Sequence, residues 1–180
     1  MKFFSVIIFL LFFSMSLAAQ ETETSIKIGD EAPVFSLPDM NNNYVFLRDY
    51  SGETLRKPWK NKTKHVIVVS FFATWCGPCK KEIPYLEKLQ NEYTGKDAKF
   101  FLVDVGEERE KVVEFLQKNP IQLTVLHDRY QQTAEKYDAK SLPRLIVIDK
   151  NGKISLIKKG FTDGDSFLME MRTLLDDLLK

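Results

Sequence analysis

The sequence predicts an α/β fold, a three-layer α/β/α sandwich with a β-hairpin added on its N-terminal side. Residues 66–72 carry no charge and are mostly β-branched or aromatic, which is typical of a central strand buried on both faces. Residues 100–105 predict a second buried strand, and apolar residues at helical spacing follow each strand. A sheet with helices on both faces would bury all of these surfaces.

The remaining elements complete this arrangement in chain order. Hairpin strands are expected over residues 34–37 with 44–47, and over residues 145–148 with 153–159. Helices are expected directly after Trp75, over residues 107–118, roughly over residues 129–137 with Asp128 as a cap, and over residues 166–179. Pro84 lies inside the first helix, where its missing N–H group should produce a kink.

The first 19 residues predict a signal peptide. Lys2 supplies a positive charge, residues 3–17 are apolar apart from three serines, and Ala18 and Ala19 suit cleavage after either one. An uncleaved membrane anchor is the alternative, but a span needs roughly 18 or more apolar residues. In both cases we expect the rest of the chain to be periplasmic or otherwise extracytoplasmic, with membrane anchoring only through residues 3–17.

Composition limits the function classes. Residues 20–27 are interpreted as a linker, and residues 28–180 as one domain. The whole chain has 26 basic and 25 acidic residues, and the leader contains only Lys2 of these, so the mature chain has 25 of each. This balance gives no electrostatic footprint for nucleic acid. Function is therefore expected from a local site.

The two cysteines, Cys76 and Cys79, predict that site. So close a pair would constrain the unfolded chain very little, so a chemical role is favoured over a structural one. Zinc would need further ligands, and His65 and His127 lie far away in sequence, which suits strand-edge or surface positions. Covalent haem attachment would need a histidine where Lys80 stands. We expect neither a metal nor a cofactor.

The cysteine pair falls between a predicted strand and a predicted helix. A cysteine at a helix N-terminus has a lowered pKa, because the helix dipole and free N–H groups favour the thiolate. Cys76 is expected to be exposed at this turn, with Cys79 on the same helical face one turn later. The predicted cycle has two steps: the Cys76 thiolate attacks a substrate disulfide, and Cys79 then displaces the substrate and closes the 76–79 bond.

Residues 72–80, Phe-Ala-Thr-Trp-Cys-Gly-Pro-Cys-Lys, resemble the active-site motif of the thioredoxin superfamily. The similarity is greater to its exported branch, the TlpA/ResA-type thiol–disulfide oxidoreductases, and it extends from residues 28–33 through residues 80–84 to the final helix. It implies a thioredoxin-like fold, with Cys76 as nucleophile and Cys79 as resolving thiol of a redox disulfide. It also implies a substrate-binding surface around the motif residues Trp75, Gly77 and Pro78 and a loop Leu142-Pro143, whose proline is cis, faces the cysteines and pairs with an extended substrate segment.

Glu82 matches an acidic residue that the ResA-type branch carries three positions after the second cysteine. One helical turn from Cys79, a partly buried carboxylate with a raised pKa could relay a proton, whereas the simpler interpretation is a solvated helix charge. Ser70 stands where cytosolic thioredoxins carry a buried aspartate, and a hydroxyl cannot act as that base. Arg144 follows the loop proline and is expected either to give the substrate groove a positive rim or to be an ordinary exposed charge.

Two other functions agree less well with the sequence. A peroxiredoxin-like thiol peroxidase would need Thr or Ser three residues before its cysteine, but Ala73 and Cys76 occupy those positions. A non-catalytic thioredoxin-fold binding module would not need an intact cysteine pair.

The direction of the reaction is predicted from the dipeptide between the cysteines. Gly77-Pro78 is the dipeptide of reducing thioredoxins, so the expected partners are exported proteins with disulfides, apocytochrome c being one candidate, and a membrane electron donor. Residues 51–64 are polar and basic, and we interpret them as a surface loop. Its Trp59 is expected to cap the domain edge, and a binding element is the alternative.

Overall fold

The computed structural model describes residues 25–57 and 63–180. The predicted signal peptide or anchor, most of the predicted linker, and Trp59 lie outside these described residues. Within the two described ranges, no helix is long and apolar enough to cross a membrane.

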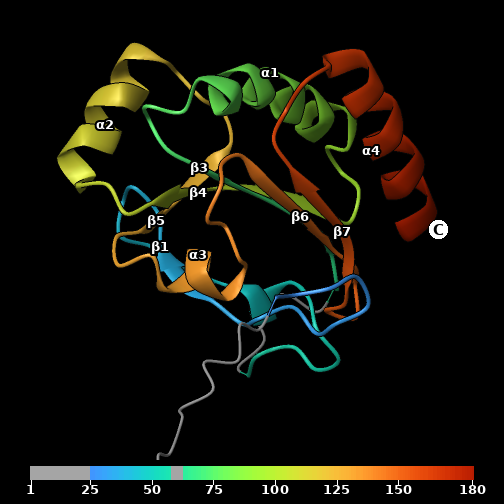
Figure 1. The fold of residues 1–180 in the computed structure, drawn as a ribbon. Coiled ribbons are helices and arrows are strands. Elements are labelled where there is room, and N and C mark those ends of the chain that lie inside the picture. The colour runs from blue at the N-terminus through green and yellow to red at the C-terminus, as the bar shows by residue number, and fades with distance from the viewer. Residues whose placement is uncertain (1–24, 58–62) are drawn as a thin grey trace, which may run out of the picture.

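A five-stranded sheet forms the centre of the fold, in the order β5-β4-β3-β6-β7 (Figure 1). Strand β3 (Val66–Phe72) is buried at every residue and pairs in parallel with β4 (Ala98–Val105), which pairs in parallel with β5 (Thr124–Asp128). On its other side, β3 pairs antiparallel with β6 (Arg144–Ile148), and β6 pairs antiparallel with β7 (Ile154–Lys159). Strand β3 thus has the central position that its uncharged sequence predicted.

Helices cover both faces of this sheet. Helices α1 (Gly77–Glu92), α2 (Arg109–Lys118) and α4 (Gly164–Leu178) lie on one face, and the short α3 (Gln132–Lys136) lies on the other (Figure 1). A hydrophobic cluster lies on each face of the sheet, and alternate residues of β3 belong to one or the other. Val68 packs in the cluster that includes α1, and Val69 in the cluster that includes α3. The predicted three-layer α/β/α sandwich is confirmed.

The N-terminal hairpin completes the layer that contains α3. Its strands are β1 (Ser36–Pro38) and β2 (Tyr44–Phe46), and a 3-10 turn over Leu47–Asp49 follows them. A bridge between Asp39 and Leu126 joins the hairpin to β5, so the hairpin covers the sheet edge that β5 would otherwise expose.

Three local expectations need correction. Strand β5 was not anticipated, because it is short and ends in His127 and Asp128, which read as polar surface residues. Helix α3 is shorter than predicted, but the Asp128 carboxylate does accept a hydrogen bond from the Ala134 N–H at 2.7 Å. Helix α2 begins at Arg109, and Glu107 lies before it in the active-site region described below.

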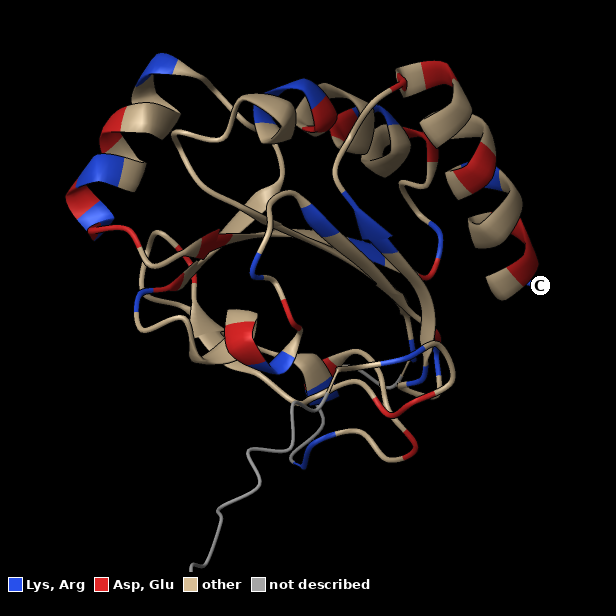
Figure 2. Ribbon diagram, viewed as in Figure 1, with Lys and Arg blue, Asp and Glu red and all other residues tan. Residues whose placement is uncertain are grey.

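The first part of the predicted surface loop is packed against the domain. The Ser51 side chain is buried, and its hydroxyl donates to the Asp149 carbonyl at 2.6 Å. Arg56 donates two hydrogen bonds to the buried Asp49 carboxylate, at 2.7 and 2.9 Å. Helices α1 and α2 carry charges of both signs, and β3 carries none (Figure 2).

Candidate redox site

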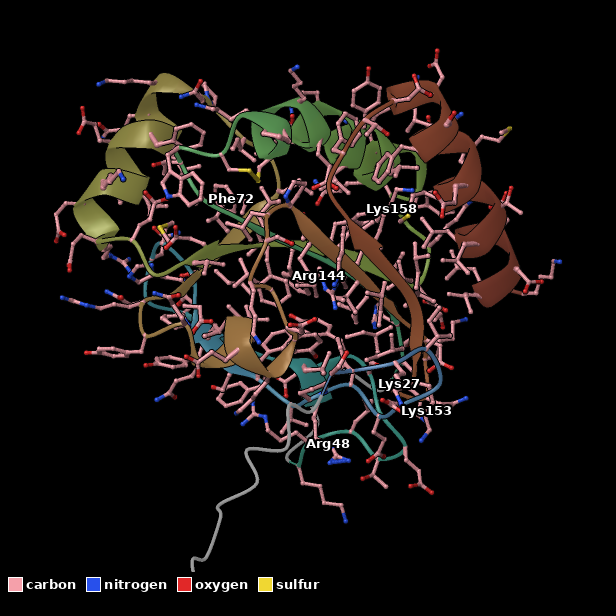
Figure 3. The ribbon with its side chains drawn as sticks, in the orientation of Figure 1. Lys27, Arg48, Phe72, Arg144, Lys153 and Lys158 are labelled. Atoms are coloured by element: carbon pink, nitrogen blue, oxygen red, sulfur yellow. A yellow bond between two sulfur atoms is a disulfide. The ribbon has the colours of Figure 1, made fainter. Side chains whose placement is uncertain are left out.

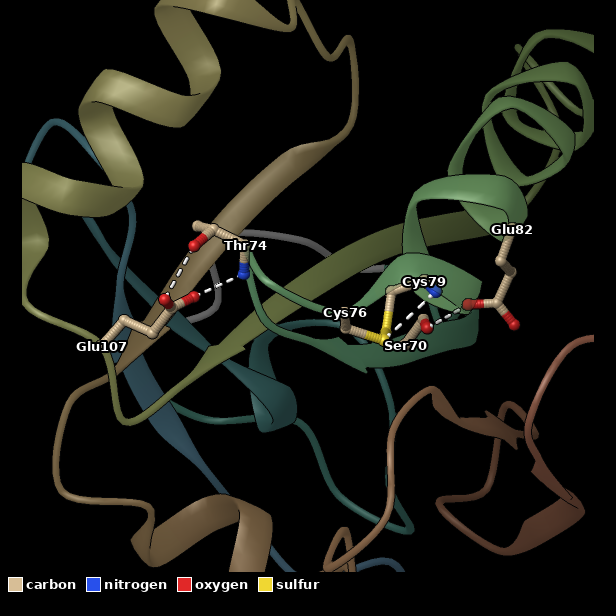
Figure 4. Close-up of a disulfide and its surroundings, with 6 residues drawn as sticks. All are labelled: Ser70, Thr74, Cys76, Cys79, Glu82 and Glu107. Carbon is tan, nitrogen blue, oxygen red and sulfur yellow. Dashed lines mark hydrogen bonds between the residues drawn. A yellow bond between two sulfur atoms is a disulfide. The ribbon is translucent and has the colours of Figure 1, made fainter.

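The cysteine pair lies at the junction between β3 and α1. Strand β3 ends at Phe72, and Cys76 is the N-cap residue of α1. Cys76 and Cys79 form a disulfide with their Cα atoms 5.3 Å apart, and the Cys79 N–H donates to Cys76 Sγ at 3.2 Å (Figure 4). Pro78, in the first turn of the helix, lacks the N–H group that would have no partner there. The strand-to-helix junction therefore places Cys76 sulfur at the positive end of the helix.

The disulfide itself is more enclosed than expected. Cys76 is only 3% exposed and Cys79 is fully buried, so the prediction of an exposed Cys76 is wrong for this disulfide form. The reason is packing: both cysteines belong to a hydrophobic cluster with Ala73, and Leu142 packs against it. Trp75 is instead the exposed residue of the motif, at 68%, with Gly77 and Pro78 exposed beside it.

Glu82 lies in the protein interior, one helical turn after Cys79. It is 1% exposed, which excludes the interpretation as a solvated helix charge. The Ser70 hydroxyl, from the middle of β3, donates to Glu82 Oε2 at 2.6 Å (Figure 4). Burial raises the pKa of Glu82 to about 7, while the hydrogen bond from Ser70 and the charge of Lys158 oppose the rise. Ser70 and Glu82 therefore form a buried hydrogen-bonded pair near Cys79, and the sequence did not predict this pairing.

A second buried carboxylate, Glu107, holds the segment that leads into Cys76. Both the N–H and the hydroxyl of Thr74 donate to it, at 2.5 and 2.7 Å (Figure 4), and Lys111 pairs with it at 2.6 Å. Burial alone would raise the pKa of Glu107, but the hydrogen bonds from Lys111 and Thr74 outweigh it and lower the pKa below its ordinary value. Sequence reasoning placed Glu107 only at the start of a helix and missed this contact.

Further buried polar residues extend from Glu107 toward the sheet edge. Asp104 is fully buried, and its Oδ2 lies 2.9 Å from His127 Nδ1. Burial, followed by the neighbouring charge of Glu107, raises the pKa of Asp104 to about 8, and burial lowers the pKa of His127. Neither residue is a surface group. Over residues 25–57 and 63–180, no cluster of three or more His, Cys, Asp or Glu side chains is arranged to hold a metal ion.

The loop before β6 lies at the same end of the sheet as the disulfide. The Leu142-Pro143 peptide bond is cis, and Arg144, the next residue, pairs with Phe71 near the end of β3. Trp75 and Leu142 face a common hollow of about 610 Å³. We call it the disulfide hollow because Trp75 directly precedes Cys76, although neither cysteine is among its lining residues. Its lining consists of Trp75, Val105, Gly106, Glu107, Glu108, Lys111, Gln131, Ala139, Lys140, Ser141 and Leu142.

Arg144 does not contribute to a positive rim, and it is not an ordinary exposed charge. The residue is 2% exposed and lies inside the fold (Figure 3), with its Nη2 atom 3.4 Å from Asp138 Oδ2. Both predictions for Arg144 are wrong because its position in β6, opposite the buried Phe71, directs it into the layer between sheet and α3.

Comparison with known proteins identifies the family. Residues 27–169 match the Redoxin family. The chain belongs to this family. ResA of Geobacillus thermodenitrificans (strain NG80-2), a thiol-disulfide oxidoreductase, is 30% identical over 138 residues, which cover 77% of this chain and 72% of that protein. ResA of Bacillus subtilis (strain 168) is 29% identical over 136 residues, covering 76% and 69%.

Solved structures agree with this assignment. A structure from Chlorobium tepidum, described as a thiol:disulfide interchange protein DsbE, superposes with a TM-score of 0.73 at 29% identity, covering 87% of this chain and all of that one. The chain is thus a thiol–disulfide oxidoreductase with a thioredoxin-like fold, as the motif predicted. These relatives favour the oxidoreductase over the thiol peroxidase and the non-catalytic module.

Proposed function

We propose that this protein is an extracytoplasmic reductase of protein disulfides that cycles between a Cys76/Cys79 dithiol and the 76–79 disulfide. Two features of the site carry the proposal: Cys76 of the disulfide is the N-cap of helix α1, and a buried carboxylate with a pKa of about 7 lies one turn after Cys79. The first feature favours a Cys76 thiolate, and the second offers a proton acceptor for Cys79 near neutral pH.

The reductive half-cycle begins with both cysteines reduced. The Cys76 thiolate attacks one sulfur of the substrate disulfide, which forms a mixed disulfide and releases the other substrate sulfur as a thiolate that takes up a proton. Cys79 then loses its proton, and its thiolate attacks Cys76 Sγ, which closes the 76–79 bond and releases the second substrate thiol. Two electrons have passed to the substrate, and a membrane electron donor must return them to the protein.

Glu82 is proposed to take the proton of Cys79 in the second step. Residues three apart on a helix are neighbours on its surface, which supports a proton transfer from the thiol to the carboxylate directly or through one water molecule. Ser70 holds the carboxylate by its hydrogen bond at 2.6 Å. Ser70 is not itself the base but positions the group that serves as one.

The substrate is proposed to bind across the disulfide hollow. This is supported by two observations: Trp75, Gly77 and Pro78 are the exposed residues of the motif, and Leu142 packs against the cluster that contains both cysteines. An extended substrate segment would add to the loop Leu142-Pro143 by backbone hydrogen bonds, with the reacting sulfur placed over Cys76.

Export and partners follow from the leader. We propose that residues 1–19 are a signal peptide cleaved after Ala18 or Ala19, that the protein is periplasmic, and that its substrates are exported proteins, apocytochrome c among them. The mass of the protein isolated from an extracytoplasmic fraction tests this. A mass that retains residues 1–19 would favour the membrane anchor over the cleaved signal peptide.

The two-cysteine cycle is tested by trapping. In Cys79→Ser the first step should proceed and the second should stop, so incubation with a disulfide substrate should accumulate a mixed disulfide, measured by mass spectrometry. Cys76→Ser is the matched control and should form none. If Cys79→Ser turned over like the wild type, the proposed resolving step would be wrong.

The direction is tested by redox titration against glutathione. A reductase should have a potential near the reducing, thioredoxin-like end of the range, roughly −270 mV, whereas a value near −120 mV would make the protein an oxidant.

For Glu82→Gln we expect resolution of the mixed disulfide to slow by at least about tenfold near pH 7. An unchanged pH profile would remove Glu82 from the mechanism.

A further inference from the structure

A second hollow lies beside the disulfide hollow, and an ion pair joins a residue of one to a residue of the other. This basic groove, of about 770 Å³, is bounded by the β1–β2 hairpin, the start of α2, and the turn from β5 to α3. Glu108 lines the disulfide hollow and Arg129 lines the basic groove, and the two side chains form an ion pair at 2.9 Å between them. A chain leaving the disulfide hollow over this ion pair would enter the basic groove.

The lining of the groove is predominantly cationic. It contains five basic side chains, Arg48, Arg56, Arg109, Arg129 and Lys136, against two acidic ones, Glu110 and Asp128. Asp128 is buried and accepts a hydrogen bond from the Ala134 N–H at 2.7 Å, so it is committed to helix α3. The surface therefore carries a net positive charge although the domain as a whole is close to neutral.

Two of the five cations are available for a ligand. Arg56 is paired with Asp49, Arg129 with Glu108, and Arg109 donates to the carbonyl groups of Asp39 and Met40. Arg48 and Lys136 are exposed and form no ion pair with any residue of the described ranges.

The groove also presents apolar and aromatic surface. Tyr44 is 56% exposed, Tyr130 76% and Val34 54%, which are high values for large apolar side chains in a folded domain. The Phe46 ring lies under the Arg56 guanidinium, 3.7 Å from ring centroid to Cζ. Exposed aromatic rings beside arginine are typical of protein-binding surfaces.

We infer that the basic groove binds an acidic, aromatic-containing flank of the same protein substrate whose disulfide lies in the disulfide hollow. The inference rests on the proposed function and adds a substrate class to it: proteins in which carboxylates and an aromatic residue lie a few positions from the reacting cysteine. An extended chain advances roughly 3.3 Å per residue, so a flank of a few residues crosses the Glu108–Arg129 ion pair between the two hollows. Charge complementarity selects the acidic flank, and the exposed rings select the aromatic residue.

The inference is tested with three disulfide peptides that differ only in their flanks. Each contains the same pair of cysteines in an intramolecular disulfide, flanked on both sides by Glu-Phe-Glu, Gln-Phe-Gln or Lys-Phe-Lys. Reduction by the pre-reduced full domain should follow the order Glu, Gln, Lys, with kcat/KM about tenfold higher for the first than for the last. The preference should weaken as salt is added, because exposed charges are screened.

A matched pair of variants locates the effect. Arg48→Glu with Lys136→Glu should remove or reverse the preference, whereas Lys88→Glu with Lys153→Glu makes the same change in net charge outside the groove and should keep it. Equal rates for all three wild-type peptides, or an equal loss of preference in both variants, would overturn the inference while leaving the reductase function intact.

Binding separates this inference from the proposed function. The Glu-Phe-Glu peptide with both cysteines replaced by serine should bind the disulfide form of the wild type and shift the amide NMR signals of Tyr44, Arg48 and Tyr130. If this peptide bound in the basic groove but no peptide were reduced, the proposed reductase function would be wrong, whereas the inferred peptide binding in the groove would be supported. Absence of binding at millimolar peptide would overturn the groove.

Discussion

Two buried glutamates stand on either side of the cysteine pair, and they differ in charge. Glu82, behind Cys79, accepts one hydrogen bond from a hydroxyl group, and burial raises its pKa to about 7. Glu107, before Cys76, accepts two hydrogen bonds from Thr74 and pairs with Lys111, and its pKa is lowered although burial acts in the opposite direction. The two residues are exposed to a similar small degree, 1% and 7%.

The difference shows that partners, together with depth in the fold, decide the role of each carboxylate. A carboxylate with several donors and a cation stays ionised and can fix a backbone segment, as Glu107 fixes Thr74. A carboxylate with one hydroxyl partner exchanges its proton near neutral pH, as general acid–base catalysis requires. The same residue type therefore serves structure on one side of the disulfide and proton transfer on the other.

The largest effect is expected from Glu107→Ala. The change leaves the N–H and hydroxyl of Thr74 without their acceptor in a buried place, so the free energy of unfolding should fall by about 4 kcal/mol. Urea denaturation at pH 7 measures it. Glu108→Ala is the control, since it removes an exposed carboxylate from the next position and should change stability little. A fall no larger than that of the control would show that Glu107 does not anchor Thr74.

A smaller effect on stability, seen as a change in its pH dependence, is expected from Glu82→Gln. The folded pKa of Glu82 lies above its ordinary value, so its contribution to stability is complete below about pH 4.5 and is lost as pH rises to about 7. The free energy of unfolding of the disulfide form should decline by up to about 3 kcal/mol over that range because of Glu82. Glu82→Gln should lack this part of the decline, and Glu87→Gln, on the same helix, should retain it. Equal pH profiles for wild type and Glu82→Gln would contradict the raised pKa.

Much of the fold could be predicted from the sequence because its strongest patterns are local. The bounds of β3 were predicted to the residue, since a charge-free β-branched run between polar segments has few other interpretations. Strand β5 was missed because its last two residues, His127 and Asp128, look exposed in sequence. They are buried with partners, Asp104 and Ala134, that only the folded sheet brings near.

The residues of the candidate site also fall into two groups, those that short sequence motifs identify and those whose contacts depend on tertiary packing. The cysteine pair, Trp75 and the loop proline belong to short motifs and could be found in sequence. Ser70 and Glu82 were each noticed, but their hydrogen bond depends on how α1 packs on β3, which spacing does not give. Glu107 and Thr74 are 33 residues apart, and Arg144 is buried only because its strand register places it opposite Phe71. Contacts that depend on tertiary packing were therefore the ones missed.

The smallest effect, and the finest test of the comparison, is expected from the two hydroxyl groups. Ser70→Ala removes the hydrogen bond that opposes the rise in the pKa of Glu82, so the pH midpoint of the stability decline should move upward by roughly one unit. Thr74→Val removes the equivalent hydroxyl beside Glu107. The backbone N–H of residue 74 can still donate its hydrogen bond to Glu107, and the ion pair between Lys111 and Glu107 remains.

Glu107 should therefore stay ionised in Thr74→Val, and stability should show no new pH dependence between about pH 5 and 8. Urea denaturation of the two disulfide-form variants across this range measures the difference. A midpoint that moved in both variants, or in neither, would mean that the hydroxyl partners do not account for the different charges of the two glutamates. A shift in Ser70→Ala alone would show that Glu82 depends on its single partner and that Glu107 is held by the others.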